Sequence, residues 1–125
     1  MKLRIKGNSM RLRVSPSEMN RLLSAGRIEE IIHFAPEPDA RLTYALETTP
    51  SHQEITVRYL PQEVIVVLSD GRARAWAESE QVGIYGDLEI GTGQLTLAVE
   101  KDFACLDRKE GNDDTFANPN SIQAC

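Results

Sequence analysis

The sequence lacks several features that would assign it to a class at once. It has only two cysteines in 125 residues, Cys105 and Cys125, and they do not show the C-x-x-C spacing of a zinc or redox site. Aromatic residues make up 6% of the chain, and none lies among the basic residues near its start, so a stacking platform for nucleic acid is missing. No apolar run approaches the roughly 20 residues of a membrane span or resembles a signal peptide. We therefore expect a cytoplasmic protein with free thiols that binds neither nucleic acid nor membrane.

Motifs for catalysis are also lacking. Gly91 and Gly93 join two predicted strands and open no helix, unlike a phosphate-binding loop. A nucleophilic Cys105 would need His33 beside it as a base, and therefore a tail that folds back onto that strand. The remaining ligand-type residues lack the spacing of a metal site: His52, Cys125, Asp107, Glu110, Asp113 and Asp114. We therefore expect no metal, no cofactor and no catalytic residue, and an enzyme is the less favoured interpretation.

What the sequence does have is an uneven distribution of charge. The net charge is −5, yet the first thirteen residues hold five basic residues and no acidic one: Lys2, Arg4, Lys6, Arg11 and Arg13. Two interpretations stay open. The basic side chains pair with acids on neighbouring strands, or they form a surface that binds an anion.

The start of the chain predicts a hairpin followed by a helix. Apolar and basic residues alternate over 2–6 and 10–14, which is typical of strands with one buried face. Gly7 and Asn8 between them can supply the positive φ angles of a two-residue turn. A helix should then start after Ser15 with a capping box closed by Glu18 and end at Gly26. Its apolar stripe would be Met19, Leu22 and Leu23.

The same order of elements recurs in the second half. "LTYALE" at 42–47 and "LTLAVE" at 95–100 share four of six residues, and Ser69 caps a second predicted helix 54 positions after Ser15. In this alignment Ile55 and Val57 take the places of Leu3 and Ile5. The second helical stripe is Ala73, Trp76 and Ala77.

These patterns predict an α+β protein built from a tandem β-β-α-β-β duplication. Residues 1–48 and 54–100 would form two units of one domain spanning 1–125, with 101–125 as an appended tail anchored by Phe103, Leu106 and Phe116. We expect one eight-stranded antiparallel sheet, curled or barrel-like, with both helices on its outer face.

A curled sheet of this kind would enclose a charged lumen. Strand alternation gives Thr, Ala and Glu the same face in both matching strands. The candidate ligand-binding residues on that face are Arg4, Lys6, Arg11, Arg13, Glu47, Arg58 and Glu100. The alternative is an open sheet whose polar face is solvated and cross-paired. Ile65 and Val67 also fall on this face and would then need cover from the tail or a partner chain.

Two resemblances bear on these expectations. The strings "RIKGNSMRLR", "WAESEQVGI" and "EKDFACL" are similar to those of a small family of uncharacterised bacterial proteins, over nearly the whole chain. The layout of eight strands and two outer helices resembles the tunnel-shaped triphosphatase and adenylate cyclase fold called CYTH. That family carries Glu-x-Glu-x-Lys on its first strand to hold a divalent metal, whereas this chain reads Lys2-Leu3-Arg4-Ile5-Lys6. The resemblance therefore implies at most an anion-binding barrel.

Three functions remain open from the sequence. The favoured one is a non-enzymatic domain that acts through protein contacts, as a homodimer or with another protein. The second is a binding barrel for an anionic, phosphate-bearing small molecule, and the third and least favoured is a phosphate-ester hydrolase.

Overall fold

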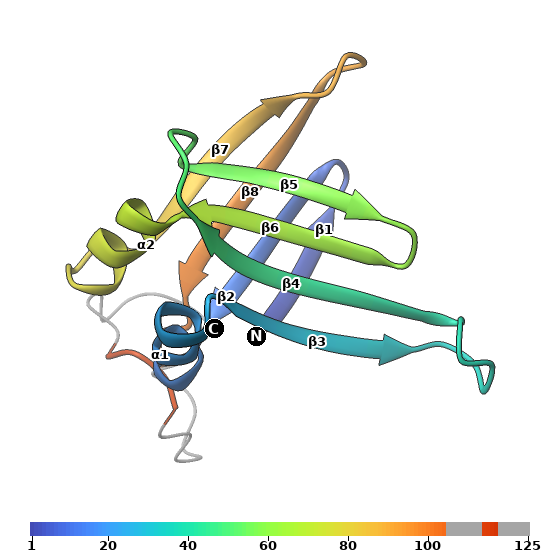
Figure 1. Cartoon of the computed structure of the whole chain (residues 1–125), viewed down its shortest axis with the longest axis horizontal. Coiled ribbons are helices and arrows are strands. Elements are labelled where there is room, and N and C mark those ends of the chain that lie inside the picture. The colour runs from blue at the N-terminus through green and yellow to red at the C-terminus, as the bar shows by residue number, and fades with distance from the viewer. Residues whose placement is uncertain (105–113, 118–125) are drawn as a thin grey trace.

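The computed structural model describes residues 1–104 and 114–117, which form eight strands and two helices (Figure 1). The first unit consists of β1 (Lys2–Lys6), β2 (Ser9–Val14), α1 (Pro16–Ala25), β3 (Arg27–His33) and β4 (Arg41–Thr49). The second unit consists of β5 (Ile55–Leu60), β6 (Glu63–Ser69), α2 (Asp70–Ala77), β7 (Gly83–Glu89) and β8 (Gln94–Lys101). The predicted order of two strands, a helix and two strands thus occurs twice.

The prediction of one antiparallel eight-stranded sheet is wrong. The described strands form two four-stranded sheets, sheet A in the order β1-β2-β8-β7 and sheet B in the order β3-β4-β6-β5. Both sheets are mixed, because β2 pairs in parallel with β8 and β4 pairs in parallel with β6. The reason is that each helix carries the chain from one sheet to the other. Each sheet therefore combines the first hairpin of one unit with the second hairpin of the other.

Local sequence signals set the ends of α1 as predicted. Ser15 is the N-cap, and its side chain accepts a hydrogen bond from the backbone N–H of Glu18, whose carboxylate in turn accepts from the N–H of Ser15. Gly26 ends the helix in the left-handed region with φ 80°, which a glycine adopts without strain. Ser69 is the N-cap of α2, and its side chain accepts a hydrogen bond from the backbone N–H of Arg72. The hairpin turn differs in one respect, because Gly7 has a positive φ and Asn8 does not.

The strand registers show that the two sheets are equivalent. β2 pairs with β8 so that Ser9 lies opposite Thr96, and β6 pairs with β4 so that Glu63 lies opposite Thr43. Swapping the two units maps one of these pairings onto the other, with offsets of 54 and 53 positions. The match between 42–47 and 95–100 thus reflects equivalent positions in the two sheets.

The predicted alignment of the first strands needs a correction. In the β1–β2 hairpin Leu3 lies opposite Leu12, and in the β5–β6 hairpin Val57 lies opposite Val66. Since Leu12 and Val66 are equivalent, Leu3 corresponds to Val57, two positions later than the sequence alignment placed it. Arg58 is accordingly the counterpart of Arg4, not of Lys6.

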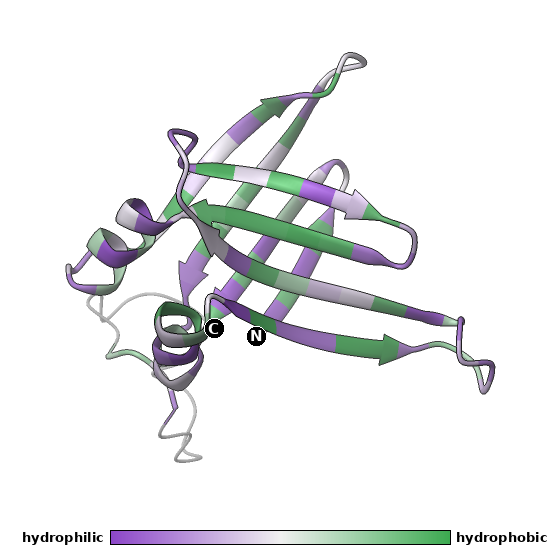
Figure 2. Ribbon diagram, viewed as in Figure 1, coloured by the Kyte–Doolittle hydropathy of each residue, from purple (hydrophilic) through white to green (hydrophobic). Residues whose placement is uncertain are grey.

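The core lies between the two sheets, and the helices close it at one end (Figure 1). The sequence predicted that the helices cover the outer face of the sheet, and this prediction is wrong. Buried residues of both sheets and both helices belong to one cluster, in which Trp76 is fully buried and donates its indole N–H to the Val82 carbonyl at 3.1 Å. Figure 2 shows β6 as apolar along most of its length, in keeping with its sequence "EVIVVLS".

Two of the three predicted anchors of the tail, Phe103 and Phe116, lie within the described residues. The rings of Phe103 and Phe116 meet edge to face with centroids 6.1 Å apart, and Phe116 packs against the core. Asp114 accepts hydrogen bonds from the N–H and the hydroxyl of Ser17 in the first turn of α1. The third predicted anchor, Leu106, lies outside the described residues, as do both cysteines.

Candidate functional site: two outward faces and a cleft

The described strands enclose no charged lumen of the predicted kind, because the charged side chains point away from the core. Two sets of residues result, one on the outward face of each sheet. Sheet A carries Arg4, Lys6, Arg11, Arg13 and Glu100, and sheet B carries Glu47 and Arg58. The structure thus separates the seven candidate residues, and a ligand enclosed by all of them is not supported.

The outward face of sheet A is basic over β1 and β2. Leu3 and Met10 face the core, so their neighbours face outward. Six side chains of β1 and β2 point this way, and all except Ser9 are basic. We call these five residues the basic face: Lys2, Arg4, Lys6, Arg11 and Arg13.

Only part of the basic face is neutralised. Lys2 forms an ion pair with Asp102 at 2.9 Å, and Arg11 with Glu100 at 3.1 Å. The other three side chains make no hydrogen bond or ion pair with any residue in the described part of the chain: Arg4, Lys6 and Arg13. Of the two sequence interpretations, cross-strand pairing therefore accounts for two of the five cations.

Tyr85 borders the basic face on β7. It is half-exposed, and its hydroxyl donates to Glu100 Oε2 at 2.7 Å. Burial and the hydrogen bond to the Glu100 carboxylate raise the pKa of Tyr85 to about 12. Glu100 therefore holds both Arg11 and Tyr85, and the face keeps its unneutralised charge on β1 and on Arg13.

The outward face of sheet B is neutral by comparison. Arg27 on β3 contacts three carboxylates, those of Glu29 at 3.2 Å, Glu63 at 3.4 Å and Glu47. Arg58 on β5 reaches the other oxygen of Glu47 at 3.2 Å. We call these five residues the neutral face: Arg27, Glu29, Glu47, Arg58 and Glu63.

The neutral face also resolves the question of what covers Ile65. This residue is fully buried although it points away from the core, and Ala45 beside it is buried as well. In the strand register, Ile65 lies between Arg58 and Ala45, and Ala45 lies beside Glu29. The long charged side chains lie across these apolar residues, as Arg and Glu stems can. The expected cover from the tail or a partner chain is therefore not needed for Ile65.

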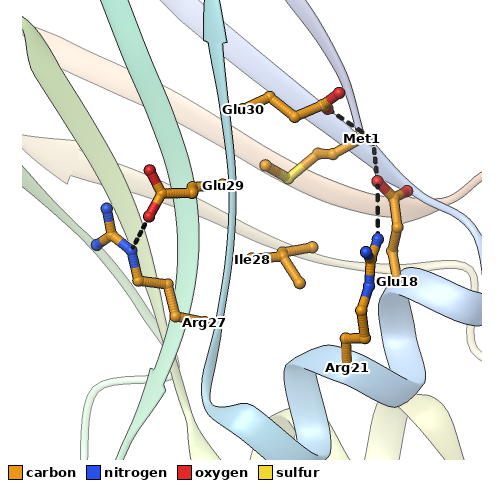
Figure 3. A pocket seen from close by; sticks show the side chains of 7 residues that line it. All are labelled: Met1, Glu18, Arg21, Arg27, Ile28, Glu29 and Glu30. Atoms are coloured by element: carbon orange, nitrogen blue, oxygen red, sulfur yellow. Dashed lines mark hydrogen bonds and ion pairs between the residues drawn. The ribbon is translucent and has the colours of Figure 1, made fainter.

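A cleft of about 410 Å³ opens along β3, next to α1 (Figure 3). Figure 3 shows Met1 and Glu30 on one side of the strand, Arg27 and Glu29 on the other, and two residues of α1 below. The lining comprises Met1, Glu18, Arg21, Arg27, Ile28, Glu29 and Glu30. The cleft is polar and lies apart from the basic face.

An ammonium group is held at the side of this cleft. The α-amino group of Met1 forms ion pairs with Glu18 and, at 2.7 Å, with Glu30. Burial works against its charge, but the hydrogen bonds to Glu18 and Glu30 outweigh burial and raise the pKa of the amine. Burial likewise opposes the charged form of Glu18, while the Met1 amine and the Ser15 N–H lower its pKa overall. The arrangement holds β1, α1 and β3 together.

Sequence reasoning missed the cleft and most of the neutral face. The string "RIEEIIH" of β3 has no clean alternation, so it did not show which carboxylates point outward. A signal was present in the repeat, because Glu47 and Glu100 occupy equivalent positions and each binds an arginine.

As to metals, the described residues include no group of three or more His, Cys, Asp or Glu side chains placed to hold an ion. No helix within that part of the chain has the length and apolar character to cross a membrane.

These features define a class: an internally duplicated α+β domain of two mixed sheets, with a charged outward face on each. The chain belongs to the family of unknown function DUF7009, whose model matches residues 1–120. This agrees with the resemblance to a small uncharacterised family. Neither curated proteins nor solved structures give a match. The resemblance to the CYTH fold is not supported, because the described strands form two separate sheets and no closed tunnel.

Proposed function

We propose that this chain is a non-enzymatic binding domain whose basic face takes up an acidic segment of a partner protein. The proposal rests on three cations on the surface of a sheet that have no partner among the described residues: Arg4, Lys6 and Arg13. Unpaired basic side chains of this kind attract acidic partners and raise the rate of association.

The shape of the surface favours a polypeptide over a small molecule. Small-molecule sites are concave and bury most of the ligand, whereas the outward face of a sheet is flat. Side chains on one face of a strand repeat every second residue, which is roughly 7 Å. An extended segment with an acidic residue at every second position has the same repeat. Arg4 and Lys6, two positions apart on β1, would each meet one carboxylate.

The experiment uses a fluorescent peptide with alternating Glu and Thr, and anisotropy measures its binding to the full chain. The test variant combines Arg4→Ala with Lys6→Ala, and the matched control is Arg58→Ala, because Arg58 is the counterpart of Arg4 on the other sheet. We expect the double variant to lose most of the affinity while its melting temperature stays close to that of the parent. The control should bind like the parent.

The salt dependence of binding gives an independent readout, since dissolved ions weaken the attraction between exposed charges. The Debye length, over which this attraction decays, is about 10 Å at 0.1 M salt. Affinity for the peptide should fall steadily as salt rises. Equal binding by the double variant and the parent, or no binding by the parent at low salt, would refute the proposal. A double variant that no longer folds would show instead that these cations are structural, which also contradicts it.

A further inference from the structure

The edge of sheet B at β3 differs from the other three sheet edges. The edges β5 and β7 lie against each other, and Gly86 faces Ile55 so closely that an added Cβ would be 2.5 Å from Ile55 Cγ2. The edge β1 carries three basic side chains, which discourage the addition of a further strand. The edge β3 is charged only in its first half, at Arg27, Glu29 and Glu30, and no other strand of the described residues covers it. Its exposed residues include Ile31 and Ile32, and Phe34 follows it with 68% of its surface exposed.

The backbone of β3 is ready to pair on this open side. The N–H of Thr48 bonds the carbonyl of Gly26, and the N–H of Phe34 bonds the carbonyl of Ala40. Since antiparallel strands alternate the direction of their hydrogen-bonding groups, the even-numbered residues of β3 face β4. The N–H and C=O groups of the odd-numbered residues therefore point away from the sheet: Arg27, Glu29, Ile31 and His33.

We propose that a second copy of this chain pairs with β3 in an antiparallel dimer whose twofold axis passes through Ile31. In this register Ile31 lies opposite the partner's Ile31, and Glu29 lies opposite the partner's His33. Each Glu29 carboxylate can then accept a hydrogen bond from an imidazole N–H. The two β3 strands join the two copies of sheet B into one continuous sheet.

Charge disfavours one of the two neighbouring registers, and in the other Glu29 has no His33 opposite it. A shift that keeps the same backbone groups in contact would place Glu30 opposite the partner's Glu30, and Arg27 opposite the partner's His33. Carboxylates that lie directly opposite each other destabilise a strand pair, and an arginine offers a histidine no acceptor. The twofold axis at Ile31 avoids both juxtapositions.

The cleft along β3 provides room for the partner strand. With the axis at Ile31, the partner's Phe34 lies opposite Ile28, and Ile28 lines the cleft (Figure 3). The aromatic ring, exposed in the single chain, would become buried against Ile28 and the Met1 side chain. Both copies make the same contact, so the association closes at a dimer and does not continue into a fibre.

Oligomeric state in solution tests the proposal, measured by light scattering on the full chain over a range of concentrations. We expect the parent to dimerise, and Ile31→Lys to be monomeric, because two ammonium groups would then meet at the axis. The matched control is Ile90→Lys, which changes an equally exposed isoleucine at the end of β7 (46% exposed against 49% for Ile31). It should leave the dimer intact, and circular dichroism should show the same fold for all three proteins.

A charge exchange tests the register itself. Glu29→Lys should weaken the dimer, and adding His33→Glu should restore it, because opposite charges then face each other again. A parent that stays monomeric at every concentration overturns the proposal. A dimer that survives Ile31→Lys also overturns it, since the contact must then lie elsewhere.

Discussion

The basic face and the neutral face occupy equivalent positions in the repeated unit, but they differ in what the residues do. On sheet B, Ile65 and Val67 replace the two arginines of β2, and Arg27 replaces Gly83. The charged side chains of sheet B form ion pairs with one another, and these pairs cover apolar residues. On sheet A the equivalent residues leave three cations without a partner in the described chain. The difference indicates that the charged side chains of sheet B contribute to the fold, whereas the basic face is the one that we propose for binding.

The largest expected effect comes from exchanging the residue at one equivalent position. Position 65 on sheet B is equivalent to position 11 on sheet A, so Ile65→Arg places an arginine where sheet A has Arg11. It should reduce the free energy of unfolding by more than about 3 kcal/mol, because a buried aliphatic side chain is replaced by a charge next to Arg58. The reverse exchange, Arg11→Ile, loses only a half-exposed ion pair and should cost less than about 1 kcal/mol. Urea denaturation measures both, and similar losses would contradict the distinction between the faces.

The seams between the sheets give a second comparison. Gly86 lies where the edge strands β5 and β7 contact each other. In the repeated unit its position is equivalent to that of Glu30 on β3. Gly86→Ala should cost about 1 to 3 kcal/mol, because its Cβ would displace the buried Ile55. Glu30→Ala should cost less than about 1 kcal/mol, because the ion pair with the Met1 amine and the long hydrogen bond from Tyr44 that it removes are made by a half-exposed carboxylate. Thermal melting compares the two, and a neutral Gly86→Ala would show that this seam is not closely packed.

A smaller difference should separate the equivalent arginines. Arg58→Ala removes a partner of Glu47 and part of the cover over Ile65, so we expect a loss of about 1 kcal/mol. Arg4→Ala removes no pair within the described residues and should leave stability unchanged within the error of urea denaturation. If Arg4→Ala were the more destabilising change, Arg4 would be a structural residue.

The smallest effect is the pH dependence of the cleft. The pKa of Glu18 lies below its ordinary 4.5 in the folded chain, so its contribution is present above pH 4.5 and disappears as the pH falls through the lowered value. The pKa of the Met1 amine is raised above 8.0, so its contribution is lost as the pH rises through the raised value. Glu18→Gln should therefore reduce stability most between these limits and little in strong acid. A constant difference at all pH values would contradict this.

Local signals were sufficient for the elements but not for their assembly. The caps at Ser15 and Gly26 depend only on neighbouring residues, and they predicted the first helix. The repeat of "LTYALE" can be read directly from the sequence, and it predicted the second helix and the matching strands. Which hairpins share a sheet depends on where each helix carries the chain, and no local pattern shows that. The basic residues of β1 and β2 were recognised as a candidate surface. The pairs of Arg27, by contrast, depend on contacts across three strands.

A residue-by-residue map of binding tests most directly whether the basic face is the binding surface. Backbone amide signals in NMR spectra can be followed as an acidic peptide is added to the full chain at low salt. We expect signals of residues 2–14 to shift, whereas those of residues 55–69, the equivalent hairpin of the other sheet, stay in place. Shifts centred on 55–69, or equal shifts in both hairpins, would contradict the assignment of binding to the basic face.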